Sequence, residues 1–394
     1  MRIGNTIYLD HHATTPVDPR VLAKMLPYFT GSFGNANSVD HAIGWVAARA
    51  TEEAAAQIAR LIRCDSDEII FTSGATEANN LALIGLMGSP PASSRRRVLL
   101  GSTDHKSALA IGRFLKERGF TVTHLRVDSD GFFDSEQLQE ELQEGVLVVS
   151  ISLVNSEIGT IQNLQEISAM TRQHGALLHC DAAQAPCAMN MDGVAEKADL
   201  VSLSAHKIYG PKGIGALYIR RDIQRLIAPI IHGGGQQRNM RSGTLPTPLC
   251  VGFGAAAELL VSPDADKERD RVGRLRDLFL DQLGKLSWPT MLNGSAGSRH
   301  PGNANIQFQG FSAEDLLGAL QPRLAASTAS ACTSGIAEPS HVLRGIGLTE
   351  DQAASSLRFC IGRYTTDMDI SDAVVLIAEG LEQMSVAGLR EVPA

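Results

Sequence analysis

The sequence predicts an α/β protein with a large domain built on a mostly parallel sheet and a second, smaller α+β domain. Between about residues 38 and 217, short apolar runs alternate with helical periods, which is the pattern of parallel strands joined by crossover helices. The chain is also 394 residues long. That length exceeds what one hydrophobic core usually serves, so a second domain is expected.

Six short runs are the candidate strands. They are apolar on both faces, as strands buried between two layers of helices are. They lie at residues 68–73, 97–102, 146–152, 176–180, 199–204 and 215–219. Helical periods that open near a capping residue lie at 76–87, 106–118 and 164–174.

The second domain is expected after the large one ends near residue 260. A charged stretch at 262–271 precedes a helical period at 272–286 and a predicted strand at 303–308. We therefore assign 15–260 to the large domain and 1–14 with 261–394 to the small one, because the first residues should fold back. Small residues at about 325–338 predict a mobile, exposed loop in the small domain.

Composition excludes several classes of protein. With 44% hydrophobic residues, 20% charged residues and a net charge of -8, the chain is typical of globular proteins that do not bind nucleic acid directly. It shows no basic leader and no apolar run near the ~18 residues that span a bilayer, so we expect a cytoplasmic protein without a membrane partner. Six cysteines without a CxxC pair predict neither disulfides nor a metal site.

One lysine is placed for covalent chemistry. Lys207 lies in the segment SLSAHKIYGPKGIG, after an apolar stretch and before a Gly-Pro-Lys-Gly turn. Burial there favours the neutral, nucleophilic amine that forms a Schiff base with a carbonyl cofactor. The alternative is a buried lysine paired with a carboxylate.

A phosphate site is indicated by the segment TSGATEANN. It supplies a strand end, a glycine turn and a helix start that carries Thr76. Ser204 and His206, and Thr244 in the glycine-rich loop at 232–246, could donate to the same phosphate. The alternative for Thr76 is a plain helix cap.

Two strand ends offer partners for a pyridine ring. Asp181 follows a buried strand, with Gln184 one turn further on, and strand ends of this kind form the crevice in which α/β sheets bind ligands. An anion beside the ring nitrogen makes the ring a stronger electron sink. His105, at another strand-to-helix junction, could lie over the ring and act as acid or base. Asp181 as a helix cap and His105 as a structural histidine are the alternatives.

These residues belong to motifs that carry a family resemblance over nearly the whole chain. The chain resembles the class V aminotransferases that use pyridoxal 5'-phosphate, and among them the NifS/IscS group of cysteine desulfurases. The resemblance implies fold type I, with a seven-stranded sheet in the large domain. The matching motifs are YLDHHATTP, FGNANS, SGATEANN, STDHKS, VNSEIGTIQ, DAAQ, SAHKIYGPKG, GGGQQRNMRSGT, SACTS with EPSHVL, and SLRFCIGRYTT.

The resemblance implies roles around the cofactor ring. Lys207 would form the internal aldimine, Asp181 would pair with the ring nitrogen, and His105 would stack on the ring. Gln184 and Asn155 would contact the ring near the cofactor hydroxyl.

The resemblance also implies roles around the phosphate. Thr76, Ser204 and His206 would bind it, and Ala75 would belong to the cofactor site. Thr244 would reach over from the partner subunit of a homodimer.

Substrate binding and sulfur transfer complete the implied site. Arg358, with Asn35 and Asn155, would bind the substrate carboxylate, which an arginine fork can hold bidentately. Cys332, in the segment STASACTSG, would be the nucleophile that receives the sulfur.

The implied activity is that of a cysteine desulfurase, a sulfurtransferase. It would convert L-cysteine to L-alanine through a ketimine and a persulfide on Cys332, and pass the sulfur to an acceptor protein. Iron-sulfur cluster assembly, thiolation of transfer RNA and sulfur modification of DNA all remain open as destinations. Transamination, selenocysteine cleavage or a docking role for sulfur carriers are the alternatives, and a mobile nucleophile argues against transamination.

Overall fold

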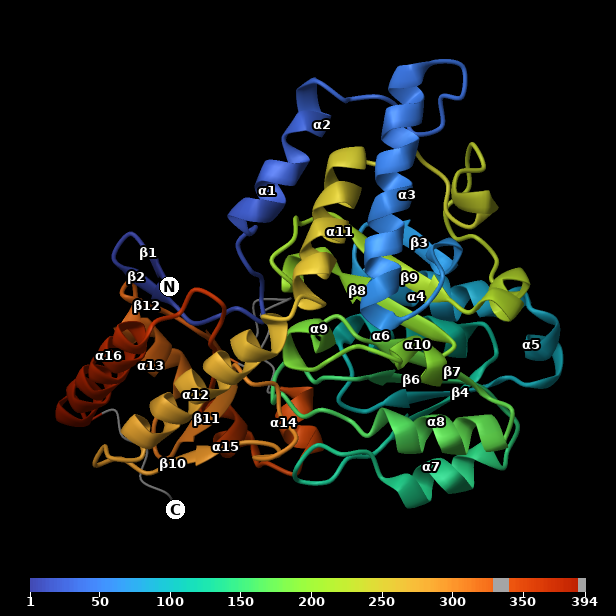
Figure 1. Ribbon diagram of the computed structural model, residues 1–394. Helices are drawn as coiled ribbons and strands as arrows, with labels where there is room; N and C mark the ends of the chain where they lie inside the picture. The colour runs from blue at the N-terminus through green and yellow to red at the C-terminus, as the bar shows by residue number, and fades with distance from the viewer. Residues whose placement is uncertain (329–339, 389–394) are drawn as a thin grey trace.

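The computed structural model of the chain describes residues 1–328 and 340–388. The chain forms two lobes, each around its own sheets (Figure 1). We call the part around the seven-stranded sheet the large lobe, and the part around two smaller sheets the small lobe. Cys332 and most of the loop predicted at about 325–338 lie outside the described residues.

The large lobe is centred on a sheet with the strand order β3-β9-β8-β7-β6-β4-β5. All its neighbouring strands are parallel except β9, which runs antiparallel to both β3 and β8. This confirms the predicted α/β fold with a mostly parallel seven-stranded sheet. The strands are β3 Ile69–Thr72, β4 Arg97–Gly101, β5 Thr121–Leu125, β6 Val146–Ser152, β7 Leu177–Asp181, β8 Leu200–Ser204 and β9 Gly215–Ile219.

Six of these strands were predicted to within one residue at each end. The seventh, β5, was missed; it lies at one edge of the sheet and is only partly buried, whereas β3 at the other edge is buried throughout and was predicted. Thr121 and His124 are exposed while Val122 and Leu125 are buried, so the strand lacks the continuous apolar run of a strand covered on both faces.

Helices cover both faces of this sheet. The helices of the large lobe are α1 Pro19–Met25, α2 Pro27–Thr30, α3 Ala42–Ile62, α4 Ala75–Gly85, α5 Pro90–Ser94, α6 Lys106–Glu117, α7 Ser135–Leu142, α8 Leu164–Gln173, α9 Ala185–Ala188, α10 Val194–Lys197 and α11 Thr247–Leu260. Helices α3, α7, α8 and α11 share one core with the sheet, whereas α4 and α6 share the other. The strands are therefore buried on both sides, which explains their apolar sequences.

The small lobe holds an antiparallel sheet, β10-β11-β14-β13, and a short sheet, β1-β2-β12. The start of the chain folds back onto this lobe, as expected, since Ile7 pairs with Leu324 and shares a core with Phe279 and Phe359. The domain boundaries drawn after residues 14 and 260 stay a prediction. The elements are β1 Arg2–Ile3, β2 Thr6–Tyr8, β10 Thr290–Leu292, β11 Asn303–Phe308, β12 Leu324–Ala325, β13 Ser327–Thr328, β14 Ser356–Cys360, α12 Ala265–Leu283, α13 Ala313–Leu320, α14 His341–Gly345, α15 Glu350–Ala354 and α16 Asp367–Val386.

Helix α12 begins earlier than predicted. The sequence analysis placed its start at residue 272, but the preceding charged stretch is already helical from Ala265. Asp266 and Glu268 lie in its first turn, where acidic side chains interact favourably with the helix dipole. The predicted strand at 303–308 coincides with β11.

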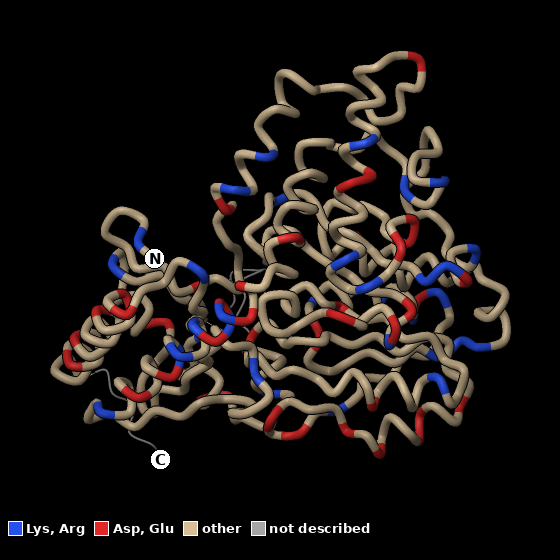
Figure 2. Tube along the Cα trace, viewed as in Figure 1, with Lys and Arg blue, Asp and Glu red and all other residues tan. Residues whose placement is uncertain are grey.

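Acidic and basic residues are interspersed over both lobes (Figure 2). Within residues 1–328 and 340–388, none of the helices has both the length and the apolar character needed to cross a membrane. In the same ranges, no three His, Cys, Asp or Glu side chains gather into a group that could hold a metal ion.

Candidate active site

A cavity of about 620 Å³ lies where the central strands end. Its walls come from the segments that follow β3, β4, β6, β7 and β8, and each of these is the carboxyl end of its strand. This is the edge at which open α/β sheets bind ligands. Ten residues predicted for the site line it: Ala75, Thr76, His105, Asn155, Asp181, Gln184, Ser204, His206, Lys207 and Arg358.

Lys207 ends a short 3-10 turn directly after β8. Its amine donates to the backbone oxygen of His12 and, at 3.0 Å, to that of Ala13, and it pairs with no carboxylate of the described residues. Burial, followed by the nearby Arg358 guanidinium, lowers the pKa of Lys207 to about 8. The structure thus favours a nucleophilic lysine over a lysine in a salt bridge.

Asp181 ends strand β7 and is almost fully buried. Its carboxylate accepts a hydrogen bond from Asn79 Nδ2 at 2.7 Å and one from the backbone N–H of Ala183 at 3.1 Å. Helix α9 begins later, after Gln184, so Asp181 does not cap it. Sequence reasoning missed Asn79, although it lies in the SGATEANN motif, because its contact with Asp181 depends on the packing of α4 over β7.

The start of helix α4 is open toward the cavity. The helix begins after Gly74, which has no side chain to cap it, and a Cβ there would meet nothing within 4 Å among the described residues. Thr76 is exposed in the first turn rather than serving as the helix cap. The first backbone N–H groups of α4, together with Thr76, can therefore bind an anion.

Ser204 and His206 approach the same region from strand β8. Ser204 is its last residue, and His206 lies two residues further on with Nδ1 at 3.2 Å from the Thr14 hydroxyl. Burial and the neighbouring Lys207 lower the pKa of His206 to about 4, so its ring is neutral at physiological pH.

The position of His105 is compatible with both functions considered for it. Its Nδ1 accepts the N–H of Ser107 at 3.1 Å and so caps helix α6, while its exposed ring lines the cavity.

Two further predicted residues hold loops in place. Asn155 donates to the Thr103 oxygen at 2.9 Å, and Gln184 donates to the His12 oxygen at 2.9 Å.

Arg358 extends from β14 of the small lobe into the cavity. Its guanidinium donates to Asp10 Oδ1 at 2.8 Å and to the Ser156 oxygen at 3.1 Å. Asp10 was not predicted for the site, although it belongs to the YLDHHATTP motif. Its pairing with Arg358 joins residues 348 positions apart, which the sequence pattern does not encode.

Two predicted residues do not line this cavity within one chain, and a third lies outside the described residues. Asn35 is exposed between α2 and α3, and its side chain accepts the N–H of Asn37 at 2.9 Å. Thr244 does not line the cavity either. Cys332 lies outside the described residues.

The cavity fits pyridoxal phosphate in size and in the kinds of groups it presents. It combines a buried amine of lowered pKa, the fixed carboxylate of Asp181, and an open helix start for a phosphate. Fold and site together define a pyridoxal-phosphate enzyme of fold type I.

Comparison with known proteins specifies the family. Residues 7–372 match the family model described as aminotransferase class-V, and the chain belongs to this family. It is 45% identical to the cysteine desulfurase IscS of Rickettsia rickettsii over 378 residues, which cover 96% of this chain and 92% of that one.

Solved structures of similar proteins share the fold of this chain. A NifS-like protein superposes with a TM-score of 0.89 at 30% identity, covering 97% of this chain and all of its own. A structure titled SspA in complex with cysteine has a TM-score of 0.80 at 33% identity, covering 91% of this chain and 99% of its own.

Proposed function

We propose that the chain is a cysteine desulfurase that removes sulfur from L-cysteine and leaves L-alanine. The observation that carries the proposal is that Lys207, Asp181 and Arg358 line one cavity, so that an amine, a ring partner and a carboxylate clamp face the same ligand. The relatives named cysteine desulfurase, and the solved structure that holds cysteine, support this choice of substrate.

The cofactor is held by residues of the large lobe. Pyridoxal phosphate, when bound, supplies a carbonyl that bonds an amine and a ring that withdraws electrons from the substrate. Lys207 Nζ would bond its carbonyl carbon, and Asp181, held by Asn79, would accept the ring N–H. The start of α4 with Thr76, together with Ser204 and His206, would bind the phosphate, and Ala75, His105, Asn155 and Gln184 would complete the wall.

The protein then handles the substrate with two side chains. Arg358 binds the substrate carboxylate and exchanges part of its contact with Asp10 for it. With substrate in place, the free amine of Lys207 would take the proton from the substrate Cα. A pKa of about 8 suits it to accept and return a proton near neutral pH.

Sulfur transfer is assigned to Cys332. Its thiolate sulfur bonds the substrate sulfur, the Cβ–S bond breaks, and the bonding electrons stay with the substrate carbon, which is protonated to give alanine. His105 takes the thiol proton of the substrate. The persulfide on Cys332 then passes its outer sulfur to an acceptor protein, such as an iron-sulfur scaffold, in the cytoplasm.

A homodimer is part of the proposal. Exposed apolar side chains gather on α1, α2, the start of α3 and the segment between α2 and α3. These elements lie in the upper part of the large lobe in Figure 1. Exposed apolar surface of this extent is typical of an interface. Asn35 lies in the same segment, so a second copy that covers it, and that contributes Thr244, would complete the site. The residues of this apolar face are Leu22, Leu26, Phe29, Phe33, Val39, Ile43, Trp45 and Val46.

Two substitutions test the proposal. Lys207→Ala is expected to abolish the yellow absorbance of the bound cofactor and all turnover. Cys332→Ser is expected to keep the colour and lose sulfide release from cysteine. Cys64→Ser, which removes a half-buried thiol that does not line the cavity, is the control and should keep both. Sulfide release by Cys332→Ser at the wild-type rate would refute the persulfide assignment.

A further inference from the structure

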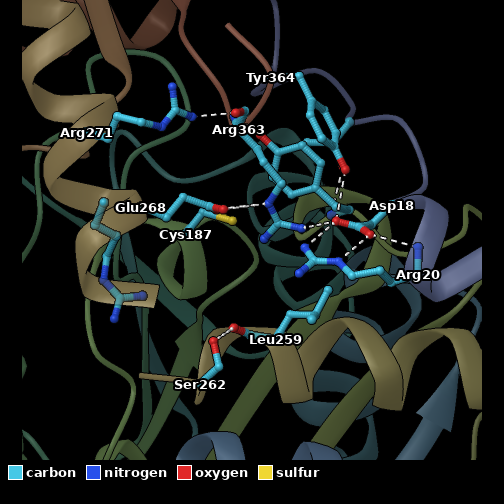
Figure 3. A network of polar contacts seen from close by, with 12 residues as sticks. Asp18, Arg20, Cys187, Leu259, Ser262, Glu268, Arg271, Arg363 and Tyr364 are labelled. Atoms are coloured by element: carbon cyan, nitrogen blue, oxygen red, sulfur yellow. Dashed lines mark hydrogen bonds and ion pairs between the residues drawn. The ribbon is translucent and has the colours of Figure 1, made fainter. Parts of the chain in front are cut away.

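Arg363 is a buried cation at the junction of the two lobes. It follows β14, the strand that carries Arg358, by three residues, and its side chain is only 6% exposed. Its Nη1 lies 2.7 Å from the carboxylate of Asp18 in the large lobe, and its Nε lies 2.8 Å from Glu268 on α12 (Figure 3). Charged residues also gather at this junction in Figure 2. Because a buried charge needs close partners, this arrangement fixes the guanidinium in place.

Asp18 is itself firmly held. It caps α1 by accepting the N–H of Arg20 at 2.9 Å, and it also accepts Arg20 Nη2 and the Tyr364 hydroxyl, each at 2.8 Å. The hydrogen bonds from Arg20, followed by those from Tyr364 and Arg363, hold the pKa of Asp18 well below its usual range. Arg363 therefore pairs with the Asp18 carboxylate, which stays charged and is held in one position by Arg20 and Tyr364.

Arg363 also contacts the turn that contains Lys207. Its backbone N–H donates to the Tyr209 hydroxyl at 2.6 Å, and its guanidinium lies 4.2 Å from the centre of the Tyr209 ring. Tyr209 has a φ of 65°, a left-handed conformation that costs a non-glycine residue about 1–2 kcal/mol and must be held by its neighbours. The approach is close, since a Cβ on Gly362 would lie 2.6 Å from the Tyr209 hydroxyl.

We propose that Arg363 is a positioning residue that sets the distance between Lys207 and Arg358. It reaches Lys207 through Tyr209, and it reaches Arg358 through the strand β14 that both share. The inference rests on the proposed function, in which these two residues act on the same amino acid. Groups that act together on one substrate must be held to within roughly 0.5 Å, so loosening this connection should weaken substrate binding.

Arg271 offers a matched control. It is another arginine that binds the same loop, but among the described residues its guanidinium donates only to the backbone oxygens of Arg363 and Thr365 (Figure 3). Arg271→Gln should therefore disturb the loop without releasing Tyr209 or Asp18.

The test compares Arg363→Gln, Arg363→Lys and Arg271→Gln as holoenzymes. The readouts are KM for L-cysteine, kcat, and the pH midpoint of the cofactor absorbance without substrate. We expect Arg363→Gln to raise KM about tenfold with a smaller change in kcat, and to shift the midpoint by about half a pH unit. Arg363→Lys keeps the charge but not the planar fork. It should therefore shift KM and the pH midpoint in the same direction as Arg363→Gln, but by smaller amounts. Wild-type KM and midpoint in Arg363→Gln would overturn the inference, as would equal shifts in Arg271→Gln.

Tyr209→Phe covers the case in which Arg363→Gln does not fold. It removes only the hydroxyl that accepts the Arg363 N–H and keeps the ring. We expect KM to rise about two- to threefold with a shift of the same absorbance midpoint, and wild-type values for both would overturn the inference. A wild-type chain that binds no cofactor would defeat the proposed function as well, whereas an active wild type with unchanged variants would defeat this inference alone.

Discussion

At the scale of the residue, the chemistry depends on the burial, the neighbouring charges and the hydrogen bonds of a few charged groups. Lys207 is buried beside the Arg358 cation, and both effects weaken the hold on its proton, although its amine donates to two backbone oxygens. Asp181 is instead fixed in place, because its carboxylate accepts hydrogen bonds from Asn79 and from a backbone N–H. The lysine is thus suited to give up its proton, and the carboxylate is held in one position.

The pKa of Lys207 gives a prediction for cofactor capture. The neutral amine is the nucleophile, so the rate of colour formation in cofactor-free protein should rise about tenfold per pH unit below pH 8 and level off above it. Stopped-flow absorbance from pH 6 to pH 10 measures this rate. With Nα-acetyl-lysine as the control, whose free ε-amine has the ordinary pKa of about 10.4, the rate should keep rising throughout this range. A protein rate that also rises up to pH 10 would show that the amine is not perturbed.

The predicted residues and the missed ones differ in a simple way. Lys207, Asp181 and His105 are recognisable because each lies in a local motif at a strand end. Asn79 and Asp10 act through partners that only the folded chain brings close, at 102 and 348 positions of separation. Local pattern therefore predicts which residues line the site, and tertiary packing decides what holds them.

At the scale of the element, strand ends and helix starts carry the site. Strands that are buried throughout, including β3 at one edge of the sheet, were predicted well because they form unbroken apolar runs, whereas β5 is partly exposed, includes polar residues and was missed. The start of α14 shows how elements are joined near the cavity. Its cap, Ser340, donates to the buried Glu157 carboxyl group, which lies just after β6. Burial raises the pKa of Glu157 to about 7.

This contact predicts a pH dependence of stability. A carboxyl group whose pKa is raised on folding stabilises the fold fully below its unfolded pKa of about 4.5, and that contribution is lost as pH rises through about 7. Relative to Glu157→Gln, which stays neutral, the wild type should lose on the order of 2 kcal/mol in free energy of unfolding between pH 5 and pH 8. Urea unfolding at four pH values measures the difference.

Glu382→Gln, on the exposed face of α16, is the matched control and should run parallel to the wild type. If Glu157→Gln also runs parallel to the wild type across this range, Glu157 does not titrate near pH 7.

At the scale of the whole molecule, the site spans two lobes. The large lobe contributes Lys207 and Asp181, and the small lobe contributes Arg358. Asn35 and Thr244 stay outside the cavity of one chain. The family resemblance assigned Thr244 to the partner subunit, but it gave no such assignment for Asn35.

Assembly can be tested on the apolar face. Phe33→Asp combined with Trp45→Asp places charges on two side chains that are more than half exposed in one chain. We expect this variant to sediment as a monomer and to lose at least about tenfold in activity, because burying an unpaired charge at an interface is costly. Val375→Asp, an equally exposed apolar position on α16, should leave the assembly unchanged. A dimeric double variant would place the interface elsewhere.

The central claim is that this chain takes sulfur, and not the amino group, from L-cysteine. The most direct measurement is NMR of the products formed from cysteine labelled with carbon-13 at Cβ, in the presence of a reductant that releases persulfide sulfur. The account predicts labelled alanine in equal amount to the sulfide released, and neither product from Lys207→Ala. Labelled 3-mercaptopyruvate, the product of amino-group transfer, or labelled pyruvate in place of alanine would contradict it, as would untouched cysteine in a protein that carries the yellow cofactor.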